Sequence, residues 1–240
     1  PFCRDNEKHA LPLFDGSWEY RRTFALGADE LSARRLLLRF EGLDTLAEVR
    51  LNGVTVLAAD NMFRTYEVDV KDALRPGENE LSVLFSSPVN YMAEKQKEKP
   101  LYGIPMVLPG YTHLRKAHYM SGWDWGPKLP DLGIWRPVEL IGFSEGRLAD
   151  VAVTQEHHAD GTVDVAFRVA VETAEAAGAG ASAGEPGRPG AADWRVEVVF
   201  LSPDGSGEYR AEAQPAADGW RAVVSVPDAK LWWPNGYGEQ

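Results

Sequence analysis

The feature that most constrains the fold is a series of short segments in which apolar and polar residues alternate. The clearest of them runs from Val163 to Val171, where every second residue is apolar. Alternation with a period of two is typical of a β-strand with one buried face, because successive side chains of a strand point to opposite faces. The same reasoning predicts strands over residues 18–26, 34–40, 47–51, 54–57, 66–70, 81–85, 134–143, 151–153, 194–201, 208–213 and 220–226.

Turn-forming residues separate these segments. Asn52-Gly53 lies between two predicted strands and predicts a tight hairpin, because both residues tolerate positive φ. The run 75–79, Arg-Pro-Gly-Glu-Asn, predicts a further turn. Ser87-Pro88 predicts a short helix that ends near Lys99, with Ser87 as its N-cap and residues 94–99 as a solvated face. Short strands joined by turns at this spacing predict an all-β sandwich or jelly roll.

The strands fall into two groups, which predicts two domains. Residues 1–144 are expected to form a jelly-roll β-sandwich. Residues 147–240 are expected to form an incomplete immunoglobulin-like β-sandwich, because about five predicted strands fall short of the seven that this fold needs. Residues 174–192 consist almost wholly of Ala, Gly, Glu, Ser and Pro, a composition that predicts a flexible insertion. A chain of 240 residues is long enough for two such domains.

The charge and cysteine content exclude several classes of protein. The net charge of -11 argues against binding to nucleic acid or to an anionic membrane. No run of about 18 apolar residues is present, so no transmembrane helix is predicted. Cys3 is the only cysteine, which excludes an internal disulfide. The single cysteine and the lack of a visible leader favour a cytoplasmic location, although a start at Pro1 is equally compatible with missing upstream residues.

The most distinctive motif is Gly-Trp-Asp-Trp-Gly-Pro at residues 122–127, within a stretch from 100 to 132 that has no sustained period. Its two indoles offer flat faces to a sugar ring, and an ionised carboxylate can accept hydrogen bonds from two sugar hydroxyls. Trp123, Asp124 and Trp125 are therefore candidate sugar-binding residues. The alternative is that both tryptophans are core anchors and Asp124 caps a turn. The neighbouring Arg115-Lys116 could orient Asp124, hold the loop, or simply face water.

No other catalytic or cofactor-binding pattern is visible. The five histidines are not accompanied by a cysteine pair, so no metal site is predicted. Phosphate-binding and nucleophile-elbow motifs are absent from the sequence, and no cofactor is expected. Glycoside hydrolysis needs two acids at a defined separation, and nothing in the sequence points to such a pair.

Four segments, in this order along the chain, resemble the β-mannosidase branch of glycoside hydrolase family two. The longest is 114–127, Leu-Arg-Lys-Ala-His-Tyr-Met-Ser-Gly-Trp-Asp-Trp-Gly-Pro, continued by Gly-Ile-Trp-Arg-Pro-Val at 133–138. The others are Trp-Glu-Tyr at 18–20 with Thr-Phe at 23–24, Asp-Asn-Met-Phe-Arg at 60–64, and Leu-Trp-Trp-Pro-Asn-Gly-Tyr-Gly at 231–238. The resemblance covers essentially the whole chain except the Ala/Gly-rich insertion.

This resemblance implies a jelly-roll sugar-binding domain, an immunoglobulin-like sandwich and then a catalytic (β/α)8 barrel. Members are retaining enzymes whose two catalytic glutamates lie on the barrel. The chain is expected to end before such a barrel and to lack the first jelly-roll strands, so no catalytic residue is assigned to it. In relatives the Trp-Asp-Trp loop reaches the barrel mouth, where its acid helps to bind the terminal sugar. The matching acid here is Asp124, with Trp123 and Trp125 beside it.

The main hypothesis is therefore the N-terminal, non-catalytic part of an exo-β-mannosidase. Its expected partners are a β-mannoside oligosaccharide substrate and its own catalytic barrel, with no nucleic acid or membrane. A sister specificity remains open, namely exo-β-glucosaminidase, β-galactosidase or endo-β-mannosidase. A stand-alone carbohydrate-binding module is the alternative from another class.

Overall fold

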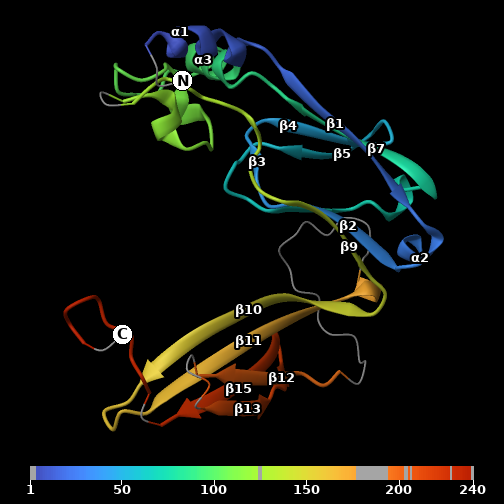
Figure 1. Cartoon of the computed structure of the whole chain (residues 1–240), viewed down its shortest axis with the longest axis vertical. Coiled ribbons are helices and arrows are strands. Elements are labelled where there is room, and N and C mark those ends of the chain that lie inside the picture. The colour runs from blue at the N-terminus through green and yellow to red at the C-terminus, as the bar shows by residue number, and fades with distance from the viewer. Residues whose placement is uncertain are drawn as a thin grey trace. The chain divides into compact units, whose positions relative to one another are not determined.

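The structure is a computed structural model that describes residues 4–123, 126–176, 194–202, 205, 207–227 and 229–238. The chain divides into two compact units, Pro1–Ser144 and Glu145–Gln240, and each is described by itself. Strands dominate the described residues of both units (Figure 1). The predicted all-β sandwich class is therefore confirmed.

The first unit is a sandwich of antiparallel sheets. One sheet has the strand order β1-β7-β4-β5 and the other the order β6-β2-β9, while β3 pairs with β8. The predicted strand over 134–143 is divided into β8 and β9, because Pro137 offers no backbone N–H for a ladder. The strands are β1 Trp18–Leu26, β2 Arg35–Phe40, β3 Leu43–Asp44, β4 Ala47–Leu51, β5 Val54–Ala59, β6 Tyr66–Asp69, β7 Gly77–Phe85, β8 Gly133–Ile134 and β9 Val138–Phe143.

The core of this unit lies between its sheets. It combines alternate residues of three central strands, as the period-two pattern predicts. Phe40 of β2 and Phe85 of β7 have no exposed surface, and neither has Val49 of β4. The buried core residues are Leu38, Phe40, Leu43, Ala47, Val49, Leu51, Ala59, Val70, Val83 and Phe85.

The turn predicted at Asn52-Gly53 is confirmed, whereas the one predicted over 75–79 is shorter, because residues 77–79 already belong to β7. A side chain joins the two turns. Asn52 and Gly53 adopt positive φ values of 51° and 83° between β4 and β5. The amide of Asn52 donates hydrogen bonds of 2.8 Å to the carbonyl oxygen of Ala73 and to Oδ1 of Asn79. Asn79 is fully buried near the start of β7, and its own amide donates to the carbonyl of Arg75 in the turn that precedes this strand. The hairpin is thus fixed against the rest of the sheet.

The helix predicted after Ser87 is also confirmed. It is α3, Pro88–Glu98, and the hydroxyl oxygen of Ser87 accepts a hydrogen bond of 3.1 Å from the N–H of Asn90. The same hydroxyl donates to the carbonyl oxygen of Phe14 at 2.7 Å, so the cap also ties the helix to the N-terminal segment. The helices that precede α3 in the chain are α1 Asn6–Ala10, η1 Leu11–Asp15, α2 Ala28–Leu31 and η2 Lys71–Ala73.

The second unit pairs the sheet β10-β11-β15-β14 with the strands β12 and β13. Its core lies between them and contains Val169, Val171, Val198, Trp220 and Val224. The short β14 is an addition to the predicted strands, because Pro215 and the short length of this segment conceal the alternating pattern. The elements are β10 Gly146–His157, β11 Val163–Thr173, η5 Ala174–Ala176, β12 Glu197–Leu201, β13 Glu208–Glu212, β14 Gln214–Ala216 and β15 Gly219–Val226.

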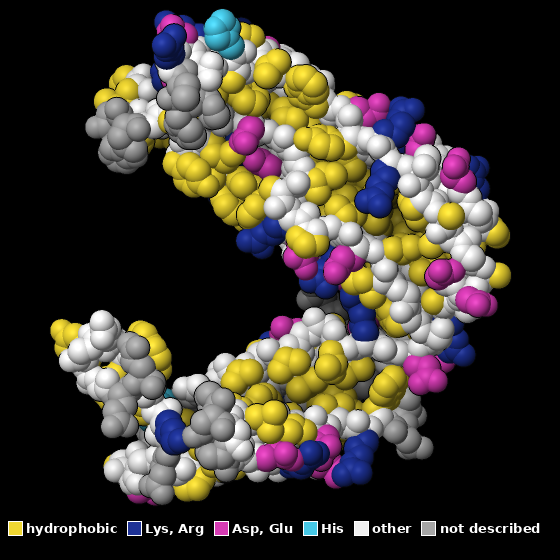
Figure 2. All heavy atoms as spheres, in the orientation of Figure 1, with side chains coloured by type: hydrophobic (Ala, Val, Ile, Leu, Met, Phe, Trp, Pro, Cys, Tyr) yellow, Lys and Arg dark blue, Asp and Glu magenta, His cyan; other side chains and the backbone are white. Residues whose placement is uncertain are grey.

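The edge strand β10 exposes apolar side chains. Leu148, Val151 and Val153 are 66%, 46% and 50% exposed. Figure 2 shows apolar side chains on the visible face where β10 and β11 run.

Most of the predicted flexible insertion at 174–192 lies outside the described residues. Among the helices that the structure describes, none combines the length and apolar character needed to cross a membrane.

Candidate functional site

The candidate site lies in the long segment between α3 and β8, which contains Trp123. The described part of this segment is mostly irregular and includes the 3₁₀-helices η3 Tyr111–His113 and η4 His118–Ser121. Val107, Leu114 and Ala117 are nevertheless buried, at 4%, 3% and 8% exposure. The segment therefore packs onto its unit with apolar side chains of its own, which gives an irregular backbone a fixed path.

Gln96 of α3 holds the beginning of this segment. Its amide donates a hydrogen bond of 2.9 Å to the carbonyl oxygen of Leu101 and accepts one of 3.2 Å from the N–H of the same residue. Its amide oxygen also lies 3.1 Å from Nε2 of His113. The predicted solvated face of α3 is confirmed at Lys97 and Glu98, which are exposed. It is wrong for the partly buried Gln96, because the amide of that residue satisfies backbone groups of the following loop.

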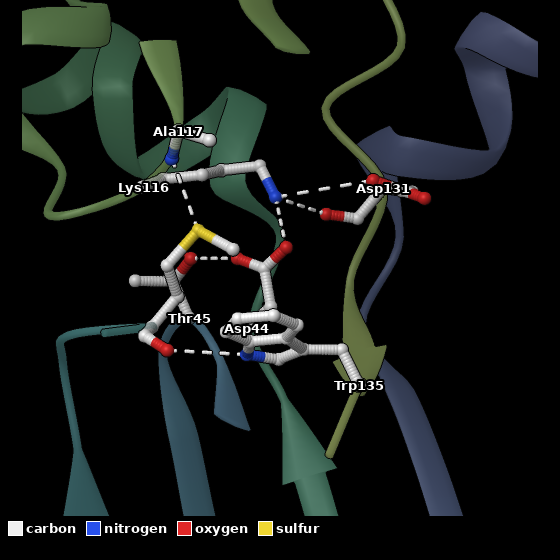
Figure 3. A network of polar contacts seen from close by, with 7 residues as sticks. Asp44, Thr45, Lys116, Ala117, Asp131 and Trp135 are labelled. Carbon is white, nitrogen blue, oxygen red and sulfur yellow. Dashed lines mark hydrogen bonds and ion pairs between the residues drawn. The ribbon is translucent and has the colours of Figure 1, made fainter. Parts of the chain in front are cut away.

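Lys116 belongs to this segment and is buried, with 3% of its side chain exposed. Its ammonium group donates a hydrogen bond to the carboxylate of Asp44 on β3 and another, of 2.6 Å, to the carbonyl oxygen of Asp131 (Figure 3). The hydroxyl of Thr45 donates to the other carboxylate oxygen of Asp44. A buried charge needs both a counter-charge and hydrogen bonds. Lys116 therefore has a structural role, and the suggestion that it faces water is wrong.

Asp131 lies at the edge of this network. Its side chain is 64% exposed, and its carboxylate lies 4.0 Å from Nζ of Lys116. Partial burial raises the pKa of Asp131, Lys116 acts in the opposite direction, and the carboxylate of Asp44 raises it further. Asp44, which is buried and in direct contact with the ammonium group, is therefore the main counter-charge of Lys116.

Three segments that are distant in the sequence meet around Met62. Its N–H donates to the carbonyl of Arg115 at 3.0 Å, and its carbonyl accepts a hydrogen bond of 3.1 Å from the indole N–H of Trp135. Its sulfur accepts one of 3.0 Å from the N–H of Ala117. Asn61 and Arg115 form a parallel bridge. The structure thus brings together residues 60–64, 114–117 and 133–138, which carry much of the resemblance stated from the sequence.

Trp123 comes directly after a glycine with an unusual backbone conformation. Gly122 has φ 99° and ψ 168°, a conformation that is almost restricted to glycine. Trp123 itself is half-buried, and its carbonyl oxygen accepts a hydrogen bond of 3.4 Å from the N–H of Gly126. Asp124 and Trp125 lie outside the described residues, and the sugar-binding roles of Trp123, Asp124 and Trp125 all stay predictions.

The described residues on either side of Trp123 are tied to other parts of the first unit. The N–H of Leu108 donates to the carbonyl of Ser121 at 3.0 Å. The N–H of Lys128 donates to Oε1 of Glu7 in α1 at 2.8 Å. These contacts, together with the Lys116 network, fix where Trp123 lies on the unit.

Comparison with known proteins identifies the first unit. Residues 1–136 match the family model described as glycosyl hydrolase 2 galactose-binding domain-like. The chain belongs to this glycosyl hydrolase 2 family. The matched residues include every strand of the two sheets except β9, the Lys116 network and Trp123, so the candidate site is part of the family domain.

The similarity to individual family members extends further. Beta-mannosidase B of Aspergillus niger is 33% identical over 242 residues, which cover all of this chain but 27% of the relative. A solved β-D-mannosidase of Dictyoglomus thermophilum is 32% identical with a TM-score of 0.82, covering 100% of this chain and 28% of that one. A β-glucuronidase of Bifidobacterium dentium, 22% identical with a TM-score of 0.59 over 90% of this chain and 34% of its own, shares the fold. The chain thus spans little more than a quarter of the length of the curated relatives.

The second unit carries the last segment of the glycosyl hydrolase 2 resemblance, 231–238. Trp232 and Tyr237 are 77% and 80% exposed, whereas Trp233 packs against Gly238. Within the residues that the structure describes, no group of three or more His, Cys, Asp or Glu side chains could hold a metal ion.

Proposed function

We propose that this chain is the N-terminal, non-catalytic part of a retaining exo-β-mannosidase. The whole enzyme hydrolyses terminal, non-reducing β-D-mannose residues of oligosaccharides. In this proposal residues 1–144 are a jelly-roll sugar-binding domain, and residues 147–240 belong to an immunoglobulin-like sandwich. The catalytic (β/α)8 barrel, with its acid/base and its nucleophile, lies outside these 240 residues.

The observation that carries this proposal is the unequal similarity to glycosidases of different specificity. Proteins named β-mannosidase match the entire chain at 32–33% identity, and the solved one does so with a TM-score of 0.82. The β-glucuronidase, at 22% identity and a TM-score of 0.59, supports the fold alone. The net charge of -11 is compatible with a neutral saccharide and unfavourable for a polyanion.

Within the enzyme, the loop at Trp123, Asp124 and Trp125 is proposed to form one wall of the subsite for the terminal mannose. The indoles offer apolar faces to the sugar ring, and the carboxylate accepts hydrogen bonds from two of its hydroxyls. The buried Lys116 network and the turn at Gly122 support this role, because they fix the position of Trp123 on a rigid sandwich.

Replacing Asp124 with alanine in the full-length gene product tests the proposal. Hydrogen bonds from sugar hydroxyls to a carboxylate are each worth about 1.5–3 kcal/mol. The loss of two of them lowers kcat/KM for an aryl β-mannoside by roughly two to four powers of ten. Asp124→Asn retains the shape and one acceptor, so it is expected to lower kcat/KM less than alanine does.

Two controls accompany this variant. Asp72→Ala removes an exposed aspartate of the same unit and should leave the kinetics unchanged. The melting temperature of Asp124→Ala is measured on the same preparation, because a turn cap would lower it while leaving kcat/KM nearly intact. That outcome would assign Asp124 to the turn, and an absence of β-mannosidase activity in the wild-type gene product would refute the proposed function itself.

A further inference from the structure

The ammonium group of Lys116 joins three parts of the first unit that are far apart in the sequence. It is held between the carboxylate of Asp44 and the carbonyl oxygen of Asp131, with a distance of 2.6 Å to the latter (Figure 3). Lysine has three donors on a flexible stem, and it is rarely buried to 3% exposure. A lysine at a buried position must therefore be retained for a contact that an apolar side chain cannot make.

The positions of Asp131 and Asp44 show which parts of the first unit Lys116 joins. Lys116 and Asp131 stand at the two ends of the segment 117–130, so a hydrogen bond between them closes the base of that segment. Asp44 lies in β3. This strand pairs with β8, which begins two residues after Asp131, and the pairing places Leu43 opposite Ile134. The closed base is thereby attached to the sheet framework, and the described residue Trp123 lies inside the closed segment.

Neighbouring contacts reinforce the Lys116 side of this closure. The backbone on both sides of Lys116 is bonded to Met62, through the carbonyl of Arg115 and the N–H of Ala117. The backbone of Lys116 is therefore fixed on the sandwich. Asp131, in contrast, lies in irregular chain, and its carbonyl oxygen accepts a hydrogen bond from the ammonium group.

We propose that Lys116 is a positioning residue, a clamp that closes the segment 117–130 and holds Trp123 in the place where the terminal sugar binds. This inference rests on the proposed function for its effect on sugar, but the closure itself does not depend on that function. Lys116 does not touch the sugar. Without the clamp, the positioned conformation of the segment is populated for only part of the time, and the apparent affinity for substrate falls by that fraction.

If Lys116 only stabilised the fold, its replacement would lower stability without a specific effect on the segment 117–130. A variant that lacks the buried charges can distinguish this role from the clamp. Lys116→Met alone leaves the carboxylate of Asp44 buried without its counter-charge, which destabilises the whole unit. The double variant Lys116→Met with Asp44→Asn removes both charges while an acceptor remains for Thr45. Replacement of a buried ion pair by neutral groups is often tolerated, so this variant is compared with wild type at similar global stability.

The experiment uses the full-length gene product, with hydrogen exchange and aryl β-mannoside kinetics measured on the same variants. In the double variant, amides of residues 117–130 should exchange at least about tenfold faster than in wild type, while amides of β4 and β7 remain protected. KM should rise about 10–100-fold with kcat changed far less, because loss of the competent population weakens binding without altering the bound state. Lys97→Met, which removes an exposed lysine of α3, is the matched control and should change neither quantity.

Unchanged exchange in 117–130, or an unchanged KM in an active double variant, would overturn the clamp. Should the double variant not fold, Lys116→Leu combined with Asp44→Asn serves for the same comparison, since it also removes both charges and the donor to the carbonyl of Asp131. A wild-type protein without β-mannosidase activity would refute the proposed function alone, because the exchange measurement still decides whether Lys116 closes the segment.

Discussion

Replacing Gly110 with alanine tests how the long segment that leads to Trp123 is seated on α3. Gly110 has φ 79°, and a Cβ built on it would lie 2.3 Å from the carbonyl oxygen of Met92 and 2.9 Å from the carbonyl carbon of that residue. Real Cβ atoms do not approach other heavy atoms this closely, so the loop and the helix would have to move apart. Met92 is 1% exposed, which leaves the helix little room for such a movement.

Gly53 supplies a matched control. Its φ of 83° is almost the same, but a Cβ built there meets no atom within 4 Å. Both alanines therefore carry the same left-handed strain, about 1–2 kcal/mol. Gly110→Ala adds overpacking against the backbone of α3, which costs about 1–3 kcal/mol. The expected losses of unfolding free energy are about 1–2 kcal/mol for Gly53→Ala and about 2–5 kcal/mol for Gly110→Ala.

The measurement is thermal unfolding of both variants beside wild type, followed by circular dichroism. For a unit of this size each kcal/mol shifts the melting temperature by about 2–4 °C, so Gly110→Ala should melt about 2–12 °C below Gly53→Ala. Hydrogen exchange of β4 and β7 amides assigns the transition to the first unit. Equal melting temperatures for the two variants would refute the reasoning, because they would mean that Gly110 does not approach Met92.

Three further predictions follow from other parts of the chain. Ser87→Ala removes the acceptor for the N–H of Asn90 and the donor to the carbonyl oxygen of Phe14. It should lower the unfolding free energy by about 1–3 kcal/mol in urea titrations, and an unaffected midpoint would exclude the cap. The hydrogen bond to Asp164 raises the pKa of His158. The stability that this hydrogen bond contributes is therefore complete below about pH 6.5, the pKa in the unfolded chain, and is lost as the pH rises through the raised pKa of the folded protein. An NMR titration should show a lower pKa for His158 in Asp164→Asn than in wild type. The 240-residue chain alone should not hydrolyse an aryl β-mannoside, since the acid/base and nucleophile are proposed to lie elsewhere, and turnover that survives repurification would contradict this.

The sequence predicts the local features of the fold well, because local rules determine them. The strand over 18–26 has the predicted bounds, and the hairpin at Asn52-Gly53 has the positive φ values that its residues favour. The cap at Ser87 is formed as predicted. Each of these features depends on residues within about four positions of one another, so the pattern contains the necessary information.

The Lys116 network could not be predicted in the same way. Lys116 and its partner Asp44 are 72 positions apart. A basic dipeptide such as Arg115-Lys116 is usually solvated, and no local rule distinguishes its exposed member from its buried one. One signal was available: Asp44 is a single acid within the otherwise apolar and neutral run from Leu43 to Ala47. Such an acid, if buried, needs a cation, but the sequence does not identify which one.

The contacts of Lys116 distinguish two kinds of residue within the motif 114–127 that resembles the family. Residues 114–117 belong to the same continuous motif as Trp123, and their place next to the proposed sugar-binding acid invites the interpretation that all residues of the motif contact sugar. The structure separates them by their contacts. Ala117 and Trp135 each donate a hydrogen bond to Met62, and Lys116 bonds to Asp44 and Asp131, all within the protein. Lys116 is buried, and its ammonium group bonds to groups of the protein. A change of sugar specificity is therefore expected from substitutions next to Trp123. Substitutions at Lys116 should instead weaken binding of every substrate alike.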